Sequence, residues 1–137
     1  MSDPFVDADI IVRLLTGDDL RKQEQSAALF ERVERGDIRL RTPITTIADV
    51  VYVLSSPRLY AMSHGQVADM LKTLIRLPGF VVENRAAVLG ALDLFASTRL
   101  DFGDALIAAS MALTGESMVY SYDHHFDKLA SVTRVEP

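Results

Sequence analysis

Residues 101–123 read DFGDALIAASMALTGESMVYSYD, and this stretch decides the fold class. Its first half is an apolar pattern of helical length that opens at Asp101, and Gly115 is the residue type that commonly closes a helix. Its second half contains a short strand over residues 118–120, followed by the acid Asp123. A helix leading directly into a strand is the repeating unit of α/β proteins with parallel strands.

The same alternation runs through the whole chain, with no repeat or linker to suggest a domain boundary. We expect Asp9 and Asn84 to cap two of the helices. The pattern predicts an α/β fold, a three-layer α/β/α sandwich with a mostly parallel central sheet, formed by one domain over residues 1–137. The expected strands are 5–7, 38–41, 80–82, 118–120 and 132–135; the expected helices are 10–15, 20–35, 44–54, 63–75, 84–97 and 101–113, with a helical turn at 124–129.

Composition excludes several kinds of chemistry. The 137 residues include no cysteine, which rules out disulfides, thiolate nucleophiles and cysteine-bound zinc. The N-terminus lacks a signal-peptide pattern, and no apolar run approaches the roughly 20 residues of a membrane span, so we expect a cytoplasmic protein without membrane contact. The net charge of -5 argues mildly against nucleic-acid binding, although phosphate contacts need only local positive charge.

Four aspartates occupy unusual places in this pattern. Asp7 and Asp123 follow predicted strands, and the carboxyl ends of parallel strands meet at one edge of a sheet. Asp49 and Asp104 stand in helical stretches that are apolar nearly all round, where we expect burial. No Lys or Arg lies within four residues of Asp7, Asp49 or Asp104, so local ion pairs do not explain them. A buried carboxylate needs a partner, a strong hydrogen bond or a metal.

If these acids converge, their mutual repulsion raises their pKa values, and a divalent cation relieves it. Carboxylate oxygens without thiolates favour Mg²⁺ or Mn²⁺. Such a cation lowers the pKa of nearby water and favours hydrolysis at phosphorus. The residues thus predict a metal-dependent nuclease.

The chain resembles the PIN-domain family, and in size and motif order the VapC-type toxin ribonucleases. The resemblance rests on FVDADIIVRLL (5–15), TIADVVYVL (46–54), LDFGDALIAA (100–109) and YSYDHHFDKL (120–129). It implies an α/β/α fold and Mg²⁺- or Mn²⁺-dependent hydrolysis of RNA. It also implies an acidic catalytic quartet of Asp7, Asp49, Asp104 and Asp123, with the metal on Asp7, Asp104 and Asp123.

Two positions depart from the family pattern. Asp49 stands where glutamate is usual, so its carboxylate reaches one methylene less far, and Asp9 stands where asparagine is common. Ser121 matches a small hydroxyl position that supports the site. The resemblance further implies a small antitoxin partner that often inserts a basic side chain into the acidic pocket, and a homodimer.

Two further acids have two interpretations each, and three basic residues have one. Asp101 is either a helix N-cap or a metal ligand, and Asp127 is either a solvated turn residue or a support for a second metal. His124 and His125 are expected at the surface without a role. Arg13, four residues after Asp9, is the best candidate for a contact with the RNA backbone.

Two alternative functions remain open from the sequence. Residues 6–10 (VDADI) resemble the strand-end acid pair of haloacid-dehalogenase-type phosphatases, but the chain lacks that family's lysine and cap insertion. A non-catalytic PIN-like module that binds RNA or protein is the other alternative, because Asp49 replaces glutamate.

Overall fold

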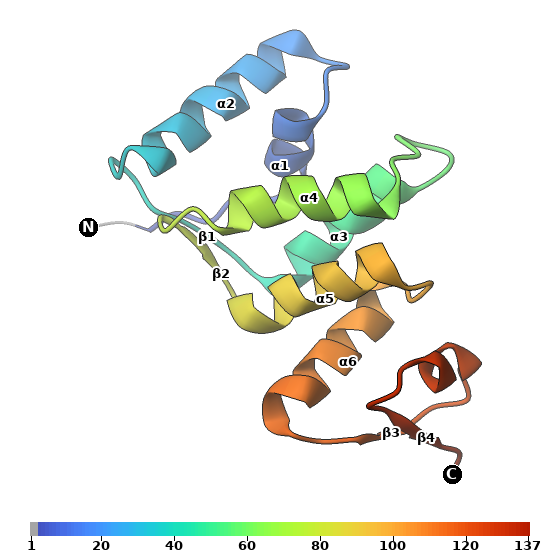
Figure 1. Cartoon of the computed structure of the whole chain (residues 1–137). Coiled ribbons are helices and arrows are strands. Elements are labelled where there is room, and N and C mark those ends of the chain that lie inside the picture. The colour runs from blue at the N-terminus through green and yellow to red at the C-terminus, as the bar shows by residue number, and fades with distance from the viewer. Residues whose placement is uncertain (1–2) are drawn as a thin grey trace.

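The computed structural model describes residues 3–137, which form helices and short parallel strands (Figure 1). The elements in chain order are α1 (Ala8–Leu15), α2 (Leu20–Glu34), β1 (Leu40–Thr42), α3 (Ile44–Ser55), α4 (His64–Ile75), β2 (Phe80–Val82), α5 (Arg85–Ser97), α6 (Phe102–Thr114), β3 (Met118–Tyr120), the 3₁₀ helix η1 (His124–Lys128) and β4 (Thr133–Val135).

The strands form two separate parallel pairs. β1 pairs with β2, with Leu40 opposite Phe80, and β3 pairs with β4, with Met118 opposite Thr133. Figure 1 shows β3 and β4 near the end of α6, apart from β1 and β2. The predicted class, α/β with parallel strands, is confirmed, but within residues 3–137 the strands are divided between two pairs rather than joined in one sheet.

The expected first strand, residues 5–7, is shorter than predicted. It makes a single parallel bridge between Phe5 and Arg41. The Val6 N–H donates to the Arg41 carbonyl at 2.9 Å, and the Arg41 N–H donates to the Pro4 carbonyl at 2.9 Å. The strand ends early because Asp7 turns the chain directly into α1.

Two caps differ from the expectation. Asp7, not Asp9, caps α1: its carboxylate accepts the Ile10 N–H at 3.2 Å. Asn84 precedes α5 but makes no capping hydrogen bond with its side chain. It adopts a left-handed φ of 52°, which asparagine tolerates better than most residues, and it serves to turn the chain from β2 into α5.

The core lies where α3, α4 and α5 pack together. Its fully buried side chains include Ile47, Leu54, Leu71, Ile75 and Leu92. Removing a buried leucine or isoleucine from water typically stabilises a fold by about 1.5–3 kcal/mol. No helix within residues 3–137 is long and apolar enough to cross a bilayer.

Gly90 fixes how closely α6 approaches α5. A Cβ atom at position 90 would stand 3.2 Å from the Cβ of Ala109. The two helices therefore touch almost backbone to backbone at this point. This contact sets the place of α6 and of the segment that follows it.

Candidate active site

Asp104 and Asp123 form the centre of the candidate site. Asp104 lies half-buried in the first turn of α6, and Asp123 lies directly before η1. Burial, the charge of Asp101 and the hydrogen bond with Asp123 together raise the pKa of Asp104 to about 6. The pKa of Asp123 is lowered, chiefly because the His125 backbone N–H donates to its carboxylate. Because the pKa of Asp104 is raised, the pair retains a proton to a higher pH than two separate aspartates would.

Asp101 acts as the N-cap of α6. Its carboxylate accepts the Asp104 N–H at 2.8 Å. Of its two sequence interpretations, the capping role is the one seen, and its charge is also a cause of the raised pKa of Asp104. Asp101 thus fixes the first turn of α6, from which the Asp104 side chain projects.

Ser121 and His125 hold Asp123 from both sides. The Asp123 N–H donates to the Ser121 hydroxyl at 2.9 Å, which gives this hydroxyl a supporting place beside the acid. His125 donates its backbone N–H to Asp123 at 2.8 Å, and its ring Nδ1 lies 2.9 Å from the carboxylate. His125 was predicted to have no role, because two adjacent histidines in a sequence do not reveal which one turns back toward the acid.

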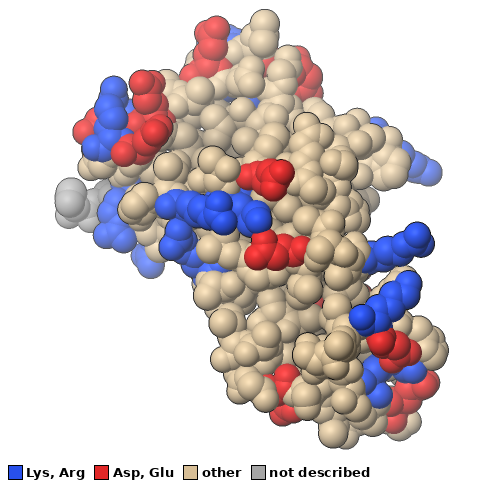
Figure 2. Space-filling view, in the orientation of Figure 1, with Lys and Arg blue, Asp and Glu red and all other residues tan. Residues whose placement is uncertain are grey.

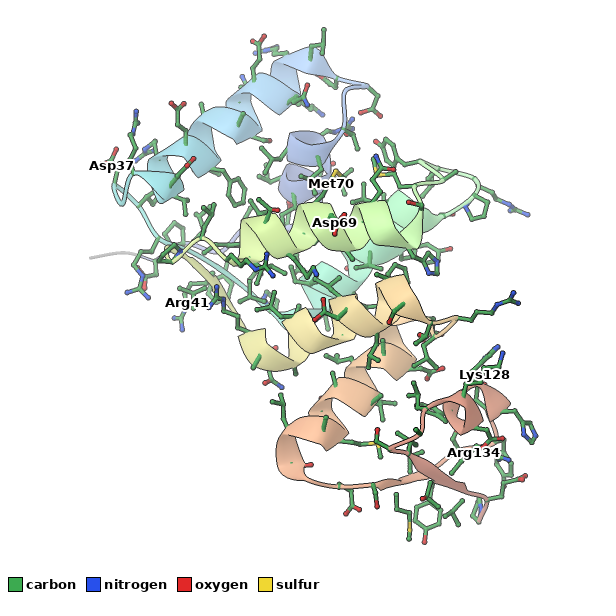
Figure 3. All side chains as sticks on the ribbon, in the orientation of Figure 1. Asp37, Arg41, Asp69, Met70, Lys128 and Arg134 are labelled. Carbon is green, nitrogen blue, oxygen red and sulfur yellow. The ribbon has the colours of Figure 1, made fainter. Side chains whose placement is uncertain are left out.

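Arg134 organises the loop that carries Asp123. Its side chain is only 10% exposed, and its Nε donates to Asp127 at 2.9 Å. Its Nη1 also donates to the Ser121 carbonyl at 3.0 Å. Figure 3 shows Arg134 inside the C-terminal part of the chain, beside η1. Arg134 was missed in the sequence, since its partners lie 7 and 13 residues away.

Asp127 is therefore more than a solvated turn residue. The Arg134 hydrogen bond is the main cause that lowers its pKa, followed by a hydrogen bond with His124. The His124 Nδ1 lies 3.0 Å from the Asp127 carboxylate. In the structure Asp127 ties η1 to β4 and so steadies the turn after Asp123.

Asp7 stands at a different place in the molecule. Its side chain is exposed at the start of α1, beside an open groove of about 490 Å³ that Phe5, Ile10 and Pro43 help to line. Asp7 is absent from the groups that shift the pKa of Asp104. Within residues 3–137, no cluster of three or more His, Asp or Glu side chains is arranged to hold a metal ion.

Asp49 does not have the burial expected from its apolar surroundings. It is exposed on α3, whereas Ile47, Val50 and Val51 are buried. The helix is apolar enough to look buried all round, yet one side of it meets solvent, and Asp49 lies on that side. Aspartate is unfavourable inside a helix, but the Asp49 carboxylate stays in contact with water and so does not pay a desolvation penalty as well.

Asp9 and Arg13 lie on one side of α1, as their spacing predicts. The Arg13 Nε is 3.4 Å from the Asp9 carboxylate, and its Nη1 is 3.4 Å from Asp18. Asp18 in turn accepts the Tyr60 hydroxyl at 2.6 Å. The Arg13 guanidinium is thus engaged by two acids at the end of α1.

A model of the PIN domain matches residues 5–132. The chain belongs to the PIN domain family. PIN domains are in general nucleases, so the family supports a hydrolase that acts on nucleic acid, and they typically use divalent metals. A solved toxin-antitoxin complex from Klebsiella pneumoniae is 15% identical, with 96% of each chain covered and a TM-score of 0.34. Among curated proteins, no sequence matches this chain.

The acidic pair of this PIN domain has the donor chemistry that a hard cation requires. Asp104 and Asp123 present carboxylate oxygens, which suit Mg²⁺ and Mn²⁺. Their proximity is costly once both are ionised, as the raised pKa of Asp104 indicates. A cation between them would remove this cost, so the pair fits the metal as part of a larger ligand set.

Proposed function

We propose that this PIN domain protein is a divalent-metal-dependent endoribonuclease of the VapC toxin type. The observation that carries the proposal is the Asp104–Asp123 pair, in which burial, the charge of Asp101 and the hydrogen bond with Asp123 raise the pKa of Asp104 to about 6. Perturbed carboxyl pairs of this kind are frequent at functional sites. The order of the acidic motifs along the chain and its length of 137 residues are the further support.

In this proposal Asp104 and Asp123 hold Mg²⁺ or Mn²⁺ together with Asp7, which must approach the pair when the cation binds, and Asp49 completes the acidic site. The cation supplies the charge that makes water a nucleophile near neutral pH and steadies the phosphate. Ser121 and His125 keep the Asp123 carboxylate oriented. Asp101 keeps Asp104 in the first turn of α6.

RNA contacts are expected from scattered basic residues. Figure 2 shows Lys and Arg in small groups interspersed with acids on the face drawn, with no continuous basic band. Arg13 remains our candidate for a phosphate contact, in which case RNA must compete with Asp9 and Asp18. Binding of this type weakens steeply with salt.

The test uses purified protein, single-stranded RNA and Mn²⁺. Wild-type protein should cleave the RNA, and Asp7→Asn and Asp104→Asn should each reduce cleavage by at least about 100-fold. Asp69→Asn is the matched control, because Asp69 is an exposed aspartate on α4. Mn²⁺ should also raise the melting temperature of wild-type protein but not of Asp104→Asn. Equal cleavage by all variants would disprove the proposal.

A non-catalytic binding module is the second candidate, and the absence of a three-acid cluster within residues 3–137 favours it. That protein would bind RNA without any melting shift in Mn²⁺ and without cleavage. The family match gives no support to the phosphatase alternative.

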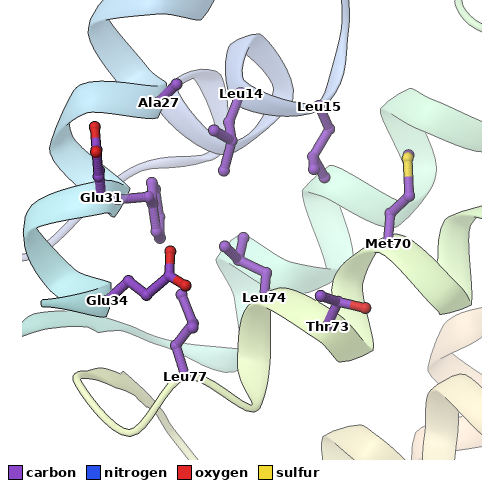
Figure 4. A pocket seen from close by; sticks show the side chains of 10 residues that line it. Leu14, Leu15, Ala27, Glu31, Glu34, Met70, Thr73, Leu74 and Leu77 are labelled. Atoms are coloured by element: carbon purple, nitrogen blue, oxygen red, sulfur yellow. The ribbon is translucent and has the colours of Figure 1, made fainter.

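We further propose an antitoxin as protein partner, with the groove between α1, α2 and α4 as its docking place. This groove of about 590 Å³ is apolar at its base, with Leu14, Leu15 and Leu74, and acidic at its rim, with Glu31 and Glu34 (Figure 4). Such a surface suits an amphipathic helix with basic flanks.

The partner test uses the product of a short reading frame beside this gene. Co-purification with that product should be lost in the double variant Glu31→Lys, Glu34→Lys. Glu24→Lys, on an exposed part of α2, is the control. Co-purification unaffected by the double variant would rule out this groove.

A further inference from the structure

A small pocket lies between the two helices that carry candidate catalytic acids. One wall comes from α3, which carries Asp49, and another comes from the first turn of α6, which carries Asp104. Phe95, near the end of α5, contributes to the third. The volume of the pocket is about 270 Å³, which is below the roughly 300–1,000 Å³ of sites that enclose a drug-sized ligand. The pocket therefore suits a single small ring system.

Aromatic rings make up much of the pocket wall. Phe95 and Phe102 are only 3% and 5% exposed, whereas Tyr52 is 71% exposed and so lies at the mouth. The Phe95 ring is held in place by His64, which stacks on it with the ring centroids 3.8 Å apart. Fixed aromatic walls and a free ring at the mouth are surfaces on which a planar ring can stack.

Asp101 provides the charge of this pocket. Among the lining residues within residues 3–137, it is the one charged side chain. One of its carboxylate oxygens accepts the Asp104 N–H at 2.8 Å, and the other has no hydrogen bond with residues 3–137. The Ser55 hydroxyl, also in the wall, is engaged, because it donates to the Val51 carbonyl at 2.6 Å. An occupant that offers an N–H group would satisfy the second oxygen of Asp101.

Gly103 leaves the Asp101 carboxylate open to a ligand. A Cβ atom at position 103 would stand 3.5 Å from the Asp101 Oδ1, with nothing else within 4 Å. A longer side chain at this position would crowd the carboxylate. With glycine there, the pocket is accessible on its acidic side.

These features distinguish between the parts of an RNA chain. A phosphate does not suit the pocket, because no Lys or Arg lines it and Asp101 repels a second negative charge. A purely apolar group would cover the Asp101 carboxylate without giving it a partner, which is costly. A nucleobase has both a flat face for stacking and N–H groups at its edge.

The pocket also lies where RNA would pass. Tyr52 follows Asp49 by three residues on α3, so the two exposed side chains are neighbours on that helix. On the opposite wall, Asp101 is bonded to the backbone of Asp104. RNA held at Asp49 and Asp104 thus has the mouth of the pocket beside it.

We propose that this pocket is a nucleobase subsite, in which a base of the RNA stacks on Tyr52 and donates an exocyclic amino group to Asp101. Acidic side chains accept hydrogen bonds from such groups, as from the amino group of cytosine. Adenine, cytosine and guanine have one and uracil has none, so the subsite discriminates against uracil. Its role in selecting the cleaved RNA rests on the proposed function, whereas base binding itself can be measured without cleavage.

The first arm of the test compares labelled oligocytidine and oligouridine of equal length by fluorescence anisotropy, in EDTA and at low salt. The two bases differ in having an amino group or a carbonyl at one ring position. Wild-type protein should bind oligocytidine about tenfold more tightly. Asp101→Asn keeps an oxygen for the cap but turns an amide N–H toward the base, so this preference should vanish or reverse. Asp69→Asn is the control and should keep it.

A ratio of two dissociation constants does not change when a variant weakens all RNA binding alike. Equal affinity of wild-type protein for the two oligonucleotides overturns the proposal, and so does an unchanged preference in Asp101→Asn. Failure of wild-type protein to bind either oligonucleotide overturns it as well.

The second arm tests stacking at position 52. Tyr52→Leu removes the aromatic face and should weaken binding of both oligonucleotides by about tenfold, whereas Tyr52→Phe should bind like wild type. Both variants should melt close to wild type, because Tyr52 is 71% exposed. Equal binding by the two variants overturns the stacking. Unchanged RNA binding with loss of the protein partner in Tyr52→Leu would assign the pocket to that partner instead.

Cleavage assays in Mn²⁺ separate this inference from the proposed function. Wild-type protein that prefers oligocytidine in binding but cleaves no RNA would overturn the proposed function and leave the base subsite in place. Cleavage of RNA without any preference in binding would overturn the base subsite alone.

Discussion

The Asp104 carboxyl shares a hydrogen bond with Asp123, and the two groups respond oppositely: the pKa of Asp104 is raised to about 6, and that of Asp123 is lowered. Asp104 is the more buried partner and has Asp101 beside it. Asp123 accepts the His125 N–H. Asp104 is therefore the acid of the pair that retains its proton to a higher pH.

Asp104→Asn should stabilise the fold above pH 6. The folded chain retains a proton on Asp104 that the unfolded chain has lost between about pH 4 and 6, so the contribution of this residue to stability falls as pH rises through that range. Allowing for solvent screening of a partly exposed group, the variant should gain on the order of 1 kcal/mol at pH 7.5 and nothing at pH 4. Urea denaturation at both pH values checks this, with Asp69→Asn as control. A gain that is the same at both values contradicts it.

Asp49→Glu should increase cleavage of RNA by several-fold. The added methylene lets the carboxylate reach farther from the exposed side of α3, and glutamate is the residue that the family resemblance leads us to expect there. Stability should change by less than about 0.5 kcal/mol, because Asp49 is exposed. RNA cleavage assays and melting curves measure both effects. Asp49→Gln is the control: its side chain is as long as that of the Asp49→Glu variant but has no charge.

Arg134→Gln should make the C-terminal segment, residues 116–137, open more often. The substitution removes the charged contacts to Asp127 and Glu136 and the bond to the Ser121 carbonyl. Proteolysis within residues 116–137 should accelerate by about tenfold, while the rest of the chain stays resistant. Limited proteolysis followed by mass spectrometry gives the readout, with the exposed Arg99→Gln as the reference. An unchanged rate of proteolysis in Arg134→Gln would show that other contacts hold residues 116–137 in place.

Gly90→Val should destabilise the protein by about 1–3 kcal/mol, because even the first added atom would lie 3.2 Å from the Ala109 Cβ. Gly65→Ala is the contrasting change: it also lies in a helix, but nothing stands within 4 Å of an added Cβ there. It should stabilise by up to about 1 kcal/mol. Thermal unfolding of both variants measures the difference, and a neutral Gly90→Val would mean that α6 shifts easily.

Local patterns predicted most helices and strands of this fold. The helix over residues 44–54, the strand over 80–82 and the stop at Gly115 match α3, β2 and the end of α6 closely. Each is set by the residues within it. The division of the strands into two pairs depends on how distant segments pack, and no local pattern contains that information.

The acids of the candidate site were predictable for a different reason. Asp104 is an isolated charge in an apolar helical stretch, and Asp123 follows a predicted strand, so both acids stood out in the sequence. Asp49 looks the same in sequence but lies on a solvent-facing side, since periodicity does not say which side of an apolar helix is open. Arg134 was not predictable, because an arginine near a terminus is ordinary until its partners are known.

The contact of Gly90 with Ala109 limits which residues this fold accepts at a position remote from the acids. A larger side chain there would displace α6, and the Asp104 carboxyl would move with it, because Asp104 lies in the first turn of that helix. Selection for the reaction would therefore also act on a glycine that has no side chain to offer it.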